Sequence, residues 1–256
     1  MPKFASREGQ RVPDVTFRYR EDGEWKDTDS TQLFKGKTVA VFSLPGAYTP
    51  TCSSTHLPRF NELAETFRAN GVDDIICVAV NDPFVMENWA GDQGCDNVFM
   101  LPDGNASFTE QMGMLVDKSD LNFGKRSWRY SMLVRDGVID KMFIEDDVPG
   151  DPFEVSDADT LLHYVNKDAQ APDQVALLSK PGCAFCAHAK QLLDAAGVAY
   201  ADISLPDSIR NCALGALAKA QTVPQLFVNG SLIGDSEAIE QWLQQRGADA
   251  GTAKME

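Results

Sequence analysis

The sequence predicts an α/β protein built from two successive domains, each a central mixed β-sheet flanked by helices. The chain has 256 residues, which is near the upper limit for one hydrophobic core. Short apolar runs of strand length alternate with segments of helical periodicity, in two successive series. The polar stretch NKDAQAPDQ, residues 166–174, separates these series. We therefore expect domains at 1–168 and 174–246, a linker at 169–173 and a flexible tail at 247–256.

In the first domain, TVAVFSL (38–44) and DIICVAVN (74–81) are continuous apolar runs that predict buried strands. The segment 54–71 has apolar residues at helical spacing and ends at a glycine, which predicts a helix. The other expected elements are a helix beginning with proline at 83–92, a strand and turn at 97–104, a hairpin within 129–145 that turns at Asp136-Gly137, and a capped helix at 156–166.

The second domain repeats this alternation in fewer residues. Strands are expected at 175–179 and 198–205, and a hairpin that turns at Asn229-Gly230 is expected at 225–234. Helices are expected at 187–197, 207–221 and 235–247.

Composition narrows the function classes. A net charge of −15 opposes binding to nucleic-acid phosphates and to anionic membrane surfaces. We see no apolar segment that would make a secretory signal or a membrane span, so we expect a cytoplasmic protein. Six cysteines are too few for a disulfide scaffold of this length, so in a reducing compartment they are catalytic, metal-binding or inert.

Cys183 and Cys186 form a Cys-x-x-Cys pair between an expected strand and an expected helix. The free N–H groups of the helix start favour a thiolate at Cys183, and Lys180 adds positive charge. Cys186 lies one turn later, within reach to resolve a mixed disulfide. Half of a zinc site is an alternative, with only His188 and Cys212 as nearby further ligands. A second alternative is that both are inert core cysteines. Covalent haem attachment would need a histidine directly after Cys186, where the sequence has Ala187.

Three motifs accompany this pair: KPGCAFC (180–186), TVPQLFVNG (222–230) and IGDSEAIE (233–240). With them, residues 174–246 resemble the glutaredoxin family, which has a thioredoxin-like fold. The resemblance implies that Cys183 is the attacking thiol and that Pro224 follows a cis peptide bond. The glutathione contacts that it implies are Lys180, Thr222, Val223, Pro224, Gly234, Asp235, Ser236 and Glu237.

The sequence departs from the glutaredoxin pattern at two positions. Ala184 stands where the family usually has proline, and Asp235 stands where it usually has a second glycine. We expect the first difference to alter the redox poise of the cysteine pair. We expect the second to reshape recognition of the γ-glutamyl end of glutathione.

Cys52 stands without a neighbouring cysteine in the loop YTPTCSSTH, residues 48–56. A lone cysteine is commonly a small buried hydrophobe. This one lies among hydroxyl residues before an expected helix, whose free N–H groups favour a thiolate. A thiolate can attack an O–O bond and become a sulfenic acid. The departing oxygen needs a hydrogen-bond donor and positive charge, which Thr49 and a distant arginine can supply. Cys77, inside an apolar run, is expected to be inert, and Cys95 and Cys212 stay unassigned.

The spacing Pro45-x-x-x-Thr49-x-x-Cys52 is the active-site motif of the peroxiredoxins. Together with GAYTPTCSSTHLPRF, VAVNDPFVMENW and RSWRYSMLVRDG, it makes residues 1 to about 165 resemble the peroxiredoxin-five subfamily. The resemblance implies that Cys52 reacts with peroxide, that Pro45 shapes and shields its loop, and that Arg129 is the active-site arginine.

Two residues near this motif have competing interpretations. Arg126 is a nearby alternative to Arg129, which we rank lower. His56 lies one turn after Cys52. We interpret it as a packing or surface residue in preference to a proton donor.

The whole chain resembles the bacterial fusions of a peroxiredoxin and a glutaredoxin. This implies a glutathione-dependent peroxidase for hydrogen peroxide and alkyl hydroperoxides, in which Cys52 is recycled through Cys183 and glutathione. Cys186 is the second candidate thiol of the glutaredoxin pair, although a mechanism that uses Cys183 alone suffices for mixed disulfides. We expect no tightly bound cofactor and no metal, with glutathione or a modified glutathione as the reducing co-substrate. We also expect a homo-oligomer, a dimer or a tetramer. The alternatives are a redox-sensing interaction protein and a deglutathionylating disulfide oxidoreductase.

Overall fold

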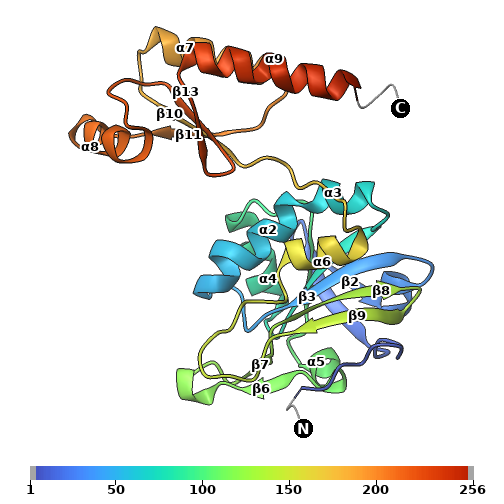
Figure 1. Cartoon of the computed structure of the whole chain (residues 1–256). Helices are drawn as coiled ribbons and strands as arrows, with labels where there is room; N and C mark the ends of the chain where they lie inside the picture. Colours follow the sequence, from blue (N-terminus) through green and yellow to red (C-terminus); the bar gives the residue numbers. More distant parts are fainter. Residues whose placement is uncertain (1–3, 253–256) are drawn as a thin grey trace. The chain divides into compact units, whose positions relative to one another are not determined.

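The structure is a computed structural model, in which residues 4–252 are described. The chain divides into two compact units, Met1–Ala171 and Pro172–Glu256 (Figure 1). The division falls inside the stretch 169–173 that the sequence predicts as a linker. Each unit is described by itself below.

The first unit is built on a five-stranded mixed sheet with the strand order β5-β4-β3-β8-β9. Its strands are β3 (Thr38–Ser43), β4 (Asp74–Ala79), β5 (Phe99–Pro102), β8 (Tyr130–Arg135) and β9 (Val138–Ile144). β3, β4 and β5 are parallel neighbours, whereas β8 is antiparallel to both β3 and β9. The β8–β9 turn is the expected one, because Asp136 and Gly137 both have positive φ, at 47° and 76°.

The chain after Cys52 does not form the single helix that the sequence predicts over 54–71. It forms a π-helical turn, η1 (Cys52–His56), followed by α2 (Leu57–Glu62) and α3 (Ala64–Ala69). The Leu57 N–H donates to the Cys52 carbonyl, five residues back, which is the wide π spacing. Pro58 has no N–H, so a regular helical bond at that position is impossible. The proline therefore accounts for the irregular start of this helix.

Two further helices of the first unit lie where the sequence predicts them: α4 (Pro83–Asp92) and α6 (Ala158–Val165). The elements that the sequence patterns did not reveal are short or exposed. They are β1 (Thr16–Glu21), β2 (Glu24–Asp29), α1 (Ser30–Phe34), α5 (Ser107–Gln111), β6 (Leu115–Asp117), η2 (Ser119–Leu121) and β7 (Lys125–Ser127). In β2 no residue is buried, so its sequence carries no apolar alternation to reveal it.

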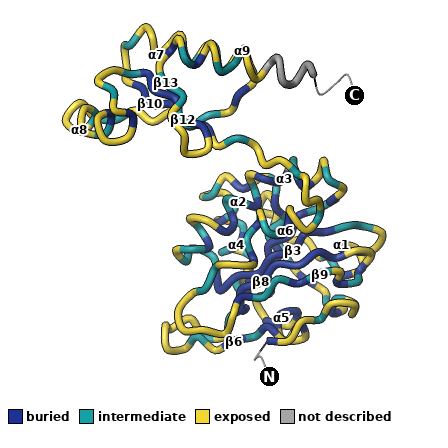
Figure 2. Tube along the Cα trace, in the orientation of Figure 1, coloured by how far each residue is buried: buried dark blue, intermediate teal, exposed yellow. Residues whose placement is uncertain are grey.

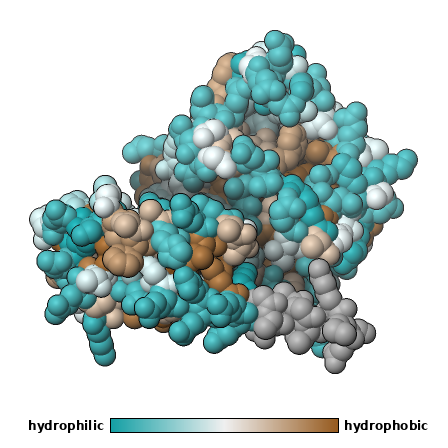
Figure 3. Space-filling model, turned by 90° about the horizontal axis from the view of Figure 1, so that it is seen from above, coloured by the Kyte–Doolittle hydropathy of each residue, from teal (hydrophilic) through white to brown (hydrophobic). Residues whose placement is uncertain are grey.

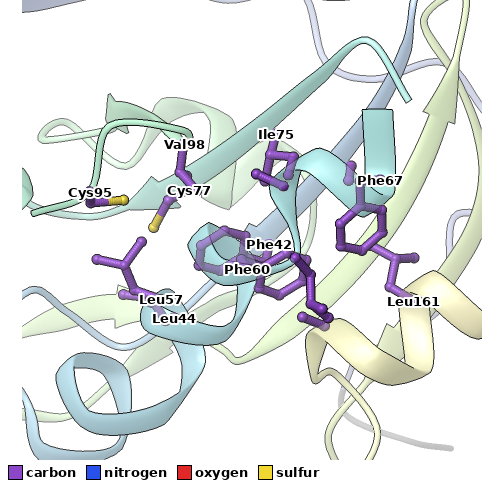
Figure 4. Close-up of a cluster of buried hydrophobic side chains, with 14 of the residues drawn as sticks. Phe42, Leu44, Leu57, Phe60, Phe67, Ile75, Cys77, Cys95, Val98 and Leu161 are labelled. Carbon is purple, nitrogen blue, oxygen red and sulfur yellow. The ribbon is translucent and has the colours of Figure 1, made fainter. Parts of the chain in front are cut away.

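The first unit buries apolar side chains in two clusters, and both contain residues of β3 and β8. Figure 2 shows both strands as buried. One cluster joins β3 and β4 to α2, α3 and α6, and its centre is drawn in Figure 4. Phe42 of β3 and Phe60 of α2 stack there, with ring centroids 4.0 Å apart. The face drawn in Figure 3 is mainly hydrophilic with scattered apolar patches, as expected for a globular protein.

The second unit has a four-stranded sheet with the order β11-β10-β12-β13. Its elements are β10 (Val175–Ser179), α7 (Ala184–Ala195), β11 (Ala201–Ser204), α8 (Asp207–Ala213), η3 (Leu214–Ala218), β12 (Gln225–Val228), β13 (Ser231–Gly234) and α9 (Ser236–Thr252). β10 is parallel to β11 and antiparallel to β12, which pairs with β13 as the predicted hairpin. The strand pattern of the first sheet is thus repeated in miniature.

The end of the chain corrects one prediction. Helix α9 continues to Thr252, whereas the sequence predicts a flexible tail from residue 247. No proline interrupts this stretch, so every residue has the N–H that a helix requires, although Gly247 and Gly251 have low helix propensity. The rest of the predicted tail, 253–256, lies outside the described residues. None of the helices described within 4–252 is both long and apolar enough to cross a bilayer.

Candidate active sites

Cys52 is the first residue of η1, in the loop region that follows β3, and its side chain is fully buried. The Arg129 guanidinium meets it: Nη1 lies 3.6 Å from the Cys52 Sγ atom. The two residues are brought together because β3 pairs with β8, with Ser43 opposite Tyr130. Arg129 immediately precedes β8, and the loop that carries Cys52 follows β3. Because these two strands are antiparallel neighbours, both segments lie at the same end of the sheet.

Arg129 is 1 % exposed, and its guanidinium is held from three sides. Nη1 also lies 3.1 Å from His56 Nδ1, and Nη2 donates to Asp151 Oδ1 at 2.5 Å. The Phe153 ring lies under the guanidinium, 5.4 Å from it. A buried cation with a carboxylate partner and a directed N–H is suited to stabilising negative charge beside a thiol.

His56 is buried and has a defined tautomer. Its Nε2 lies 3.1 Å from the Ser156 carbonyl oxygen, which can only accept, so Nε2 carries the proton. Nδ1 therefore accepts from Arg129. Burial, reinforced by the Arg129 charge, holds the pKa of His56 well below its usual range, so the ring is neutral. The structure thus shows a packing residue, as the sequence indicates, but its contact with Arg129 was not foreseen.

The other predicted residues of this site surround the loop. Pro45 is buried, two residues after the end of β3. The Thr49 hydroxyl donates to the Gly46 carbonyl at 2.8 Å, and no hydrogen bond between described residues links it to Cys52. Arg126 donates from Nη1 to the Val80 carbonyl at 2.5 Å. Arg129, the higher-ranked arginine, is therefore the one that contacts the thiol.

Three further cysteines lie outside this arrangement. Cys77 is fully buried in β4, and burial, with the neighbouring Cys52 and Cys95, raises the pKa of its thiol well above the usual value (Figure 4). Burial likewise raises the pKa of Cys95 to about 11. Cys212 is exposed on α8. The prediction that Cys77 is a core residue is confirmed by its burial.

Cys183 is the N-cap residue of α7, and its Sγ accepts from the Cys186 N–H at 3.2 Å. Burial opposes the thiolate, but the Cys186 thiol, the N–H groups of Cys186 and Phe185, and the Lys180 charge outweigh it. Together they hold the pKa of Cys183 below its usual value. Burial and the bond to Cys183 raise the pKa of Cys186 to about 11. The two pKa values are thus shifted in opposite directions, so the thiolate is favoured at Cys183 and disfavoured at Cys186.

A pocket of about 430 Å³ opens beside Cys183. Its lining includes the predicted contacts Lys180, Thr222, Val223, Pro224, Asp235, Ser236 and Glu237. The Val223–Pro224 peptide bond is cis, as the resemblance implies, and the Val223 carbonyl lies 3.9 Å from the Cys183 Sγ. Gly234 is outside the pocket lining. Its φ of 130° and a Cβ that would stand 2.9 Å from Ala238 explain why only glycine fits there.

The pocket also contains residues that the sequence patterns did not reveal, notably Arg210, Asn211 and Gln221. Asp235, the departure from the glutaredoxin pattern, caps α9, because its Oδ1 accepts from the N–H groups of Glu237 and Ala238 at 3.2 and 3.3 Å. In the described part of the chain, no three His, Cys, Asp or Glu side chains gather as a metal site.

The lowered pKa of Cys183 yields a first prediction. A depressed pKa means that the thiolate persists as the pH falls below the ordinary thiol value. We expect the pH midpoint of Cys183 alkylation by iodoacetamide to lie below that of an ordinary cysteine and to rise in Lys180→Gln. The measurement is the alkylation rate from pH 4 to 10, with the exposed Lys167→Gln as control. If Lys180→Gln leaves this midpoint unchanged, the Lys180 charge does not contribute to the lowered pKa of Cys183.

Comparison with protein-family models identifies both units. The Redoxin model matches residues 7–162, and the Glutaredoxin model matches residues 175–233. Cys52 and Arg129 lie inside the first match, and Cys183 and Val223 lie inside the second.

A curated relative covers both units at once. The chain is 54% identical to the hybrid peroxiredoxin hyPrx5 of Haemophilus influenzae over 239 residues, which is 93% of this chain and 99% of the relative. The chain belongs to the hybrid peroxiredoxins. Peroxiredoxin sll1621 of Synechocystis is 56% identical, over 69% of this chain and 97% of the relative.

Solved structures agree for the first unit. The hybrid peroxiredoxin is similar to reduced Prx3 of Vibrio vulnificus in complex with H2O2, with a TM-score of 0.58 and 40% identity over 62% of this chain and 98% of that one. It is also similar to a 1-Cys peroxiredoxin of Plasmodium falciparum, with a TM-score of 0.60 and 32% identity over 64% of this chain and 100% of that one. The predicted α/β class with thioredoxin-like domains is confirmed, and the protein is a peroxidase that carries a glutaredoxin domain.

Proposed function

We propose that the chain is a glutathione-dependent thiol peroxidase in which Cys52 reduces hydrogen peroxide and alkyl hydroperoxides. The observation that supports this most directly is the Arg129 Nη1 atom 3.6 Å from the Cys52 sulfur, inside a buried site. A peroxide oxygen that reaches the sulfur also comes within reach of this guanidinium. Positive charge and an N–H donor are then in place where the departing oxygen becomes negative.

In the first step the Cys52 thiolate attacks one oxygen of the hydroperoxide. An S–O bond forms as the O–O bond breaks, so the sulfur is oxidised to a sulfenic acid and the peroxide is reduced to an alcohol or water. The departing oxygen takes up a proton. His56 is neutral, and its single proton is donated to the Ser156 carbonyl, so it is not the source of that proton.

In the recycling steps one glutathione condenses with the sulfenic acid and releases water, which leaves a mixed disulfide on Cys52. The Cys183 thiolate attacks the glutathione sulfur of that disulfide and releases Cys52 as a thiolate. A second glutathione attacks the Cys183 mixed disulfide and leaves as oxidised glutathione. The sum converts one hydroperoxide and two glutathiones into one alcohol, one water and one disulfide, so no local partner for Cys52 is required.

The charges of the pocket beside Cys183 suit glutathione. Lys180 and Arg210 contribute positive charge to its lining, and Asp235 and Glu237 contribute negative charge. Glutathione carries carboxylates and one ammonium group, so both kinds of charge in the pocket can find a counterpart. Its cysteine would lie along the Val223 backbone, beside the Cys183 thiol.

The test is peroxide turnover with glutathione as the only reductant. We expect Cys52→Ser to abolish turnover. We expect Cys183→Ser to lower it at least about tenfold while single-turnover oxidation of Cys52 is unaffected, because only recycling is lost. Cys212→Ser, at an exposed position, is the control and should match the parent chain. Turnover that survives Cys52→Ser would overturn the peroxidase site, and turnover unaffected by Cys183→Ser would overturn the internal relay.

We also propose a cytoplasmic location and a homo-oligomeric state, dimer or tetramer. Both proposals are based on the similarity of this chain to other peroxiredoxins. Light scattering of the purified chain measures the oligomeric state directly.

A further inference from the structure

The connection between β9 and α6 folds back over the buried arginine. Within it, the segment 151–156 makes three contacts with the Cys52 site. Asp151 pairs with Arg129 Nη2, the Phe153 ring lies 4.8 Å from the His56 ring, and the Ser156 carbonyl accepts from His56 Nε2. None of these contacts follows from the motif around Cys52, and the peroxidase chemistry above does not use Asp151.

A buried carboxylate anchors this segment. Glu145 is 2 % exposed and follows β9 directly. Its carboxylate accepts from the N–H groups of Glu154, Val155 and Ser156 at 2.8–3.0 Å and from the Ser156 hydroxyl at 2.7 Å. The Glu145 N–H in turn donates to the Arg129 carbonyl at 3.2 Å. The segment is therefore fixed to the same backbone that carries the arginine.

Asp151 completes the placement of the guanidinium. Nη1 is shared between His56 and Cys52, so Asp151 supplies the separate contact for Nη2. Because the guanidinium is planar, fixing both Nη atoms fixes its orientation. The Asp151 side chain is 43% exposed, whereas that of Arg129 is 1% exposed. The carboxylate thus lies at the solvent side of the ion pair, and the cation points inward to the sulfur.

We propose that Asp151 is a positioning residue for peroxide reduction, which acts by aiming Arg129 Nη1 at the oxygen that leaves Cys52. This inference rests on the proposed role of Cys52 and Arg129. Without Asp151, the guanidinium can turn about its remaining contacts with His56 and Phe153. The attacking sulfur stays in place, but the donor for the departing oxygen is misdirected.

The test compares two reactions of the same thiol in the full chain, both followed by mass spectrometry of the Cys52 peptide. Oxidation by hydrogen peroxide needs the aimed arginine, whereas alkylation by iodoacetamide needs the thiolate but no donor for a departing peroxide oxygen. We expect Asp151→Ala to slow peroxide oxidation about tenfold and to leave alkylation unchanged or faster. Asp151→Asn keeps an acceptor oxygen for Nη2 and should stay within about threefold of the parent chain.

Asp146→Asn, at an exposed position of the same connection, is the matched control for a changed charge and should leave both rates unchanged. If Asp151→Ala leaves peroxide oxidation unchanged, or slows both reactions in parallel, the inference is overturned. Asp151→Asn as slow as Asp151→Ala would overturn the proposed role of the acceptor oxygen. Failure of the proposed function is seen separately, as turnover that persists in Cys52→Ser.

Discussion

Replacing Arg129 with glutamine should slow the oxidation of Cys52 by hydrogen peroxide about 100- to 1000-fold, the usual cost of losing one preorganised donor to a developing anion. Arg129 places a charged N–H 3.6 Å from the sulfur, and the side chains of both Cys52 and Arg129 are buried. Glutamine keeps a polar side chain but loses the charge and one arm of the fork. The measurement is the single-turnover rate of Cys52 oxidation under limiting peroxide.

Arg126→Gln is the matched control, because the sequence leaves both arginines as candidates. Arg126 donates to the Val80 carbonyl and has no hydrogen bond to Cys52 among the described contacts. We expect this variant to stay within about threefold of the parent chain. Arg129→Lys, which keeps the charge without the planar fork, should fall between the two. Equal losses in Arg126→Gln and Arg129→Gln would contradict the assignment to Arg129.

Replacing Phe60 with alanine should lower the free energy of unfolding of the first domain by about 3–5 kcal/mol. Its ring is fully buried and nearly parallel to that of Phe42, at 4.0 Å and 3° (Figure 4). It also packs against Phe67 and His56, at 5.9 and 5.6 Å between ring centroids. Truncation opens a cavity at the centre of the cluster that supports α2. Phe60 lies about one helical turn after His56, the residue that contacts Arg129.

Urea titration followed by tryptophan fluorescence measures this loss. A Trp242→Phe background removes the one tryptophan of the second unit, so the signal comes from the first. Leu121→Ala, 54% exposed in η2, is the control and should change the free energy by less than about 0.5 kcal/mol. A loss below about 1 kcal/mol in Phe60→Ala would show that the surrounding rings collapse into the space.

The sequence was most informative where local chemistry decides local structure. The apolar runs of β3 and β4 and the turn residues Asp136-Gly137 and Asn229-Gly230 predicted strands and hairpins that the structure contains. It was least informative for β2, in which no residue is buried, and for β1, in which only Phe17 is buried, because so few core-facing residues make no clear apolar alternation. It also missed the π-helical turn at Cys52, although Pro58 was the local signal for an irregular helix.

By itself, the sequence determined which thiols are reactive candidates. A cysteine in a polar loop before a helix, and a Cys-x-x-Cys at a second strand–helix junction, are local patterns that mark Cys52 and Cys183. Only the tertiary structure decided what surrounds them. Sheet pairing between β3 and β8 brings Arg129 to Cys52, and the fold-back of segment 151–156 brings Asp151 to Arg129. These residues are far apart along the chain, so their contacts depend on how the strands pair and on how the segment after β9 folds back. No local spacing in the sequence encodes such contacts.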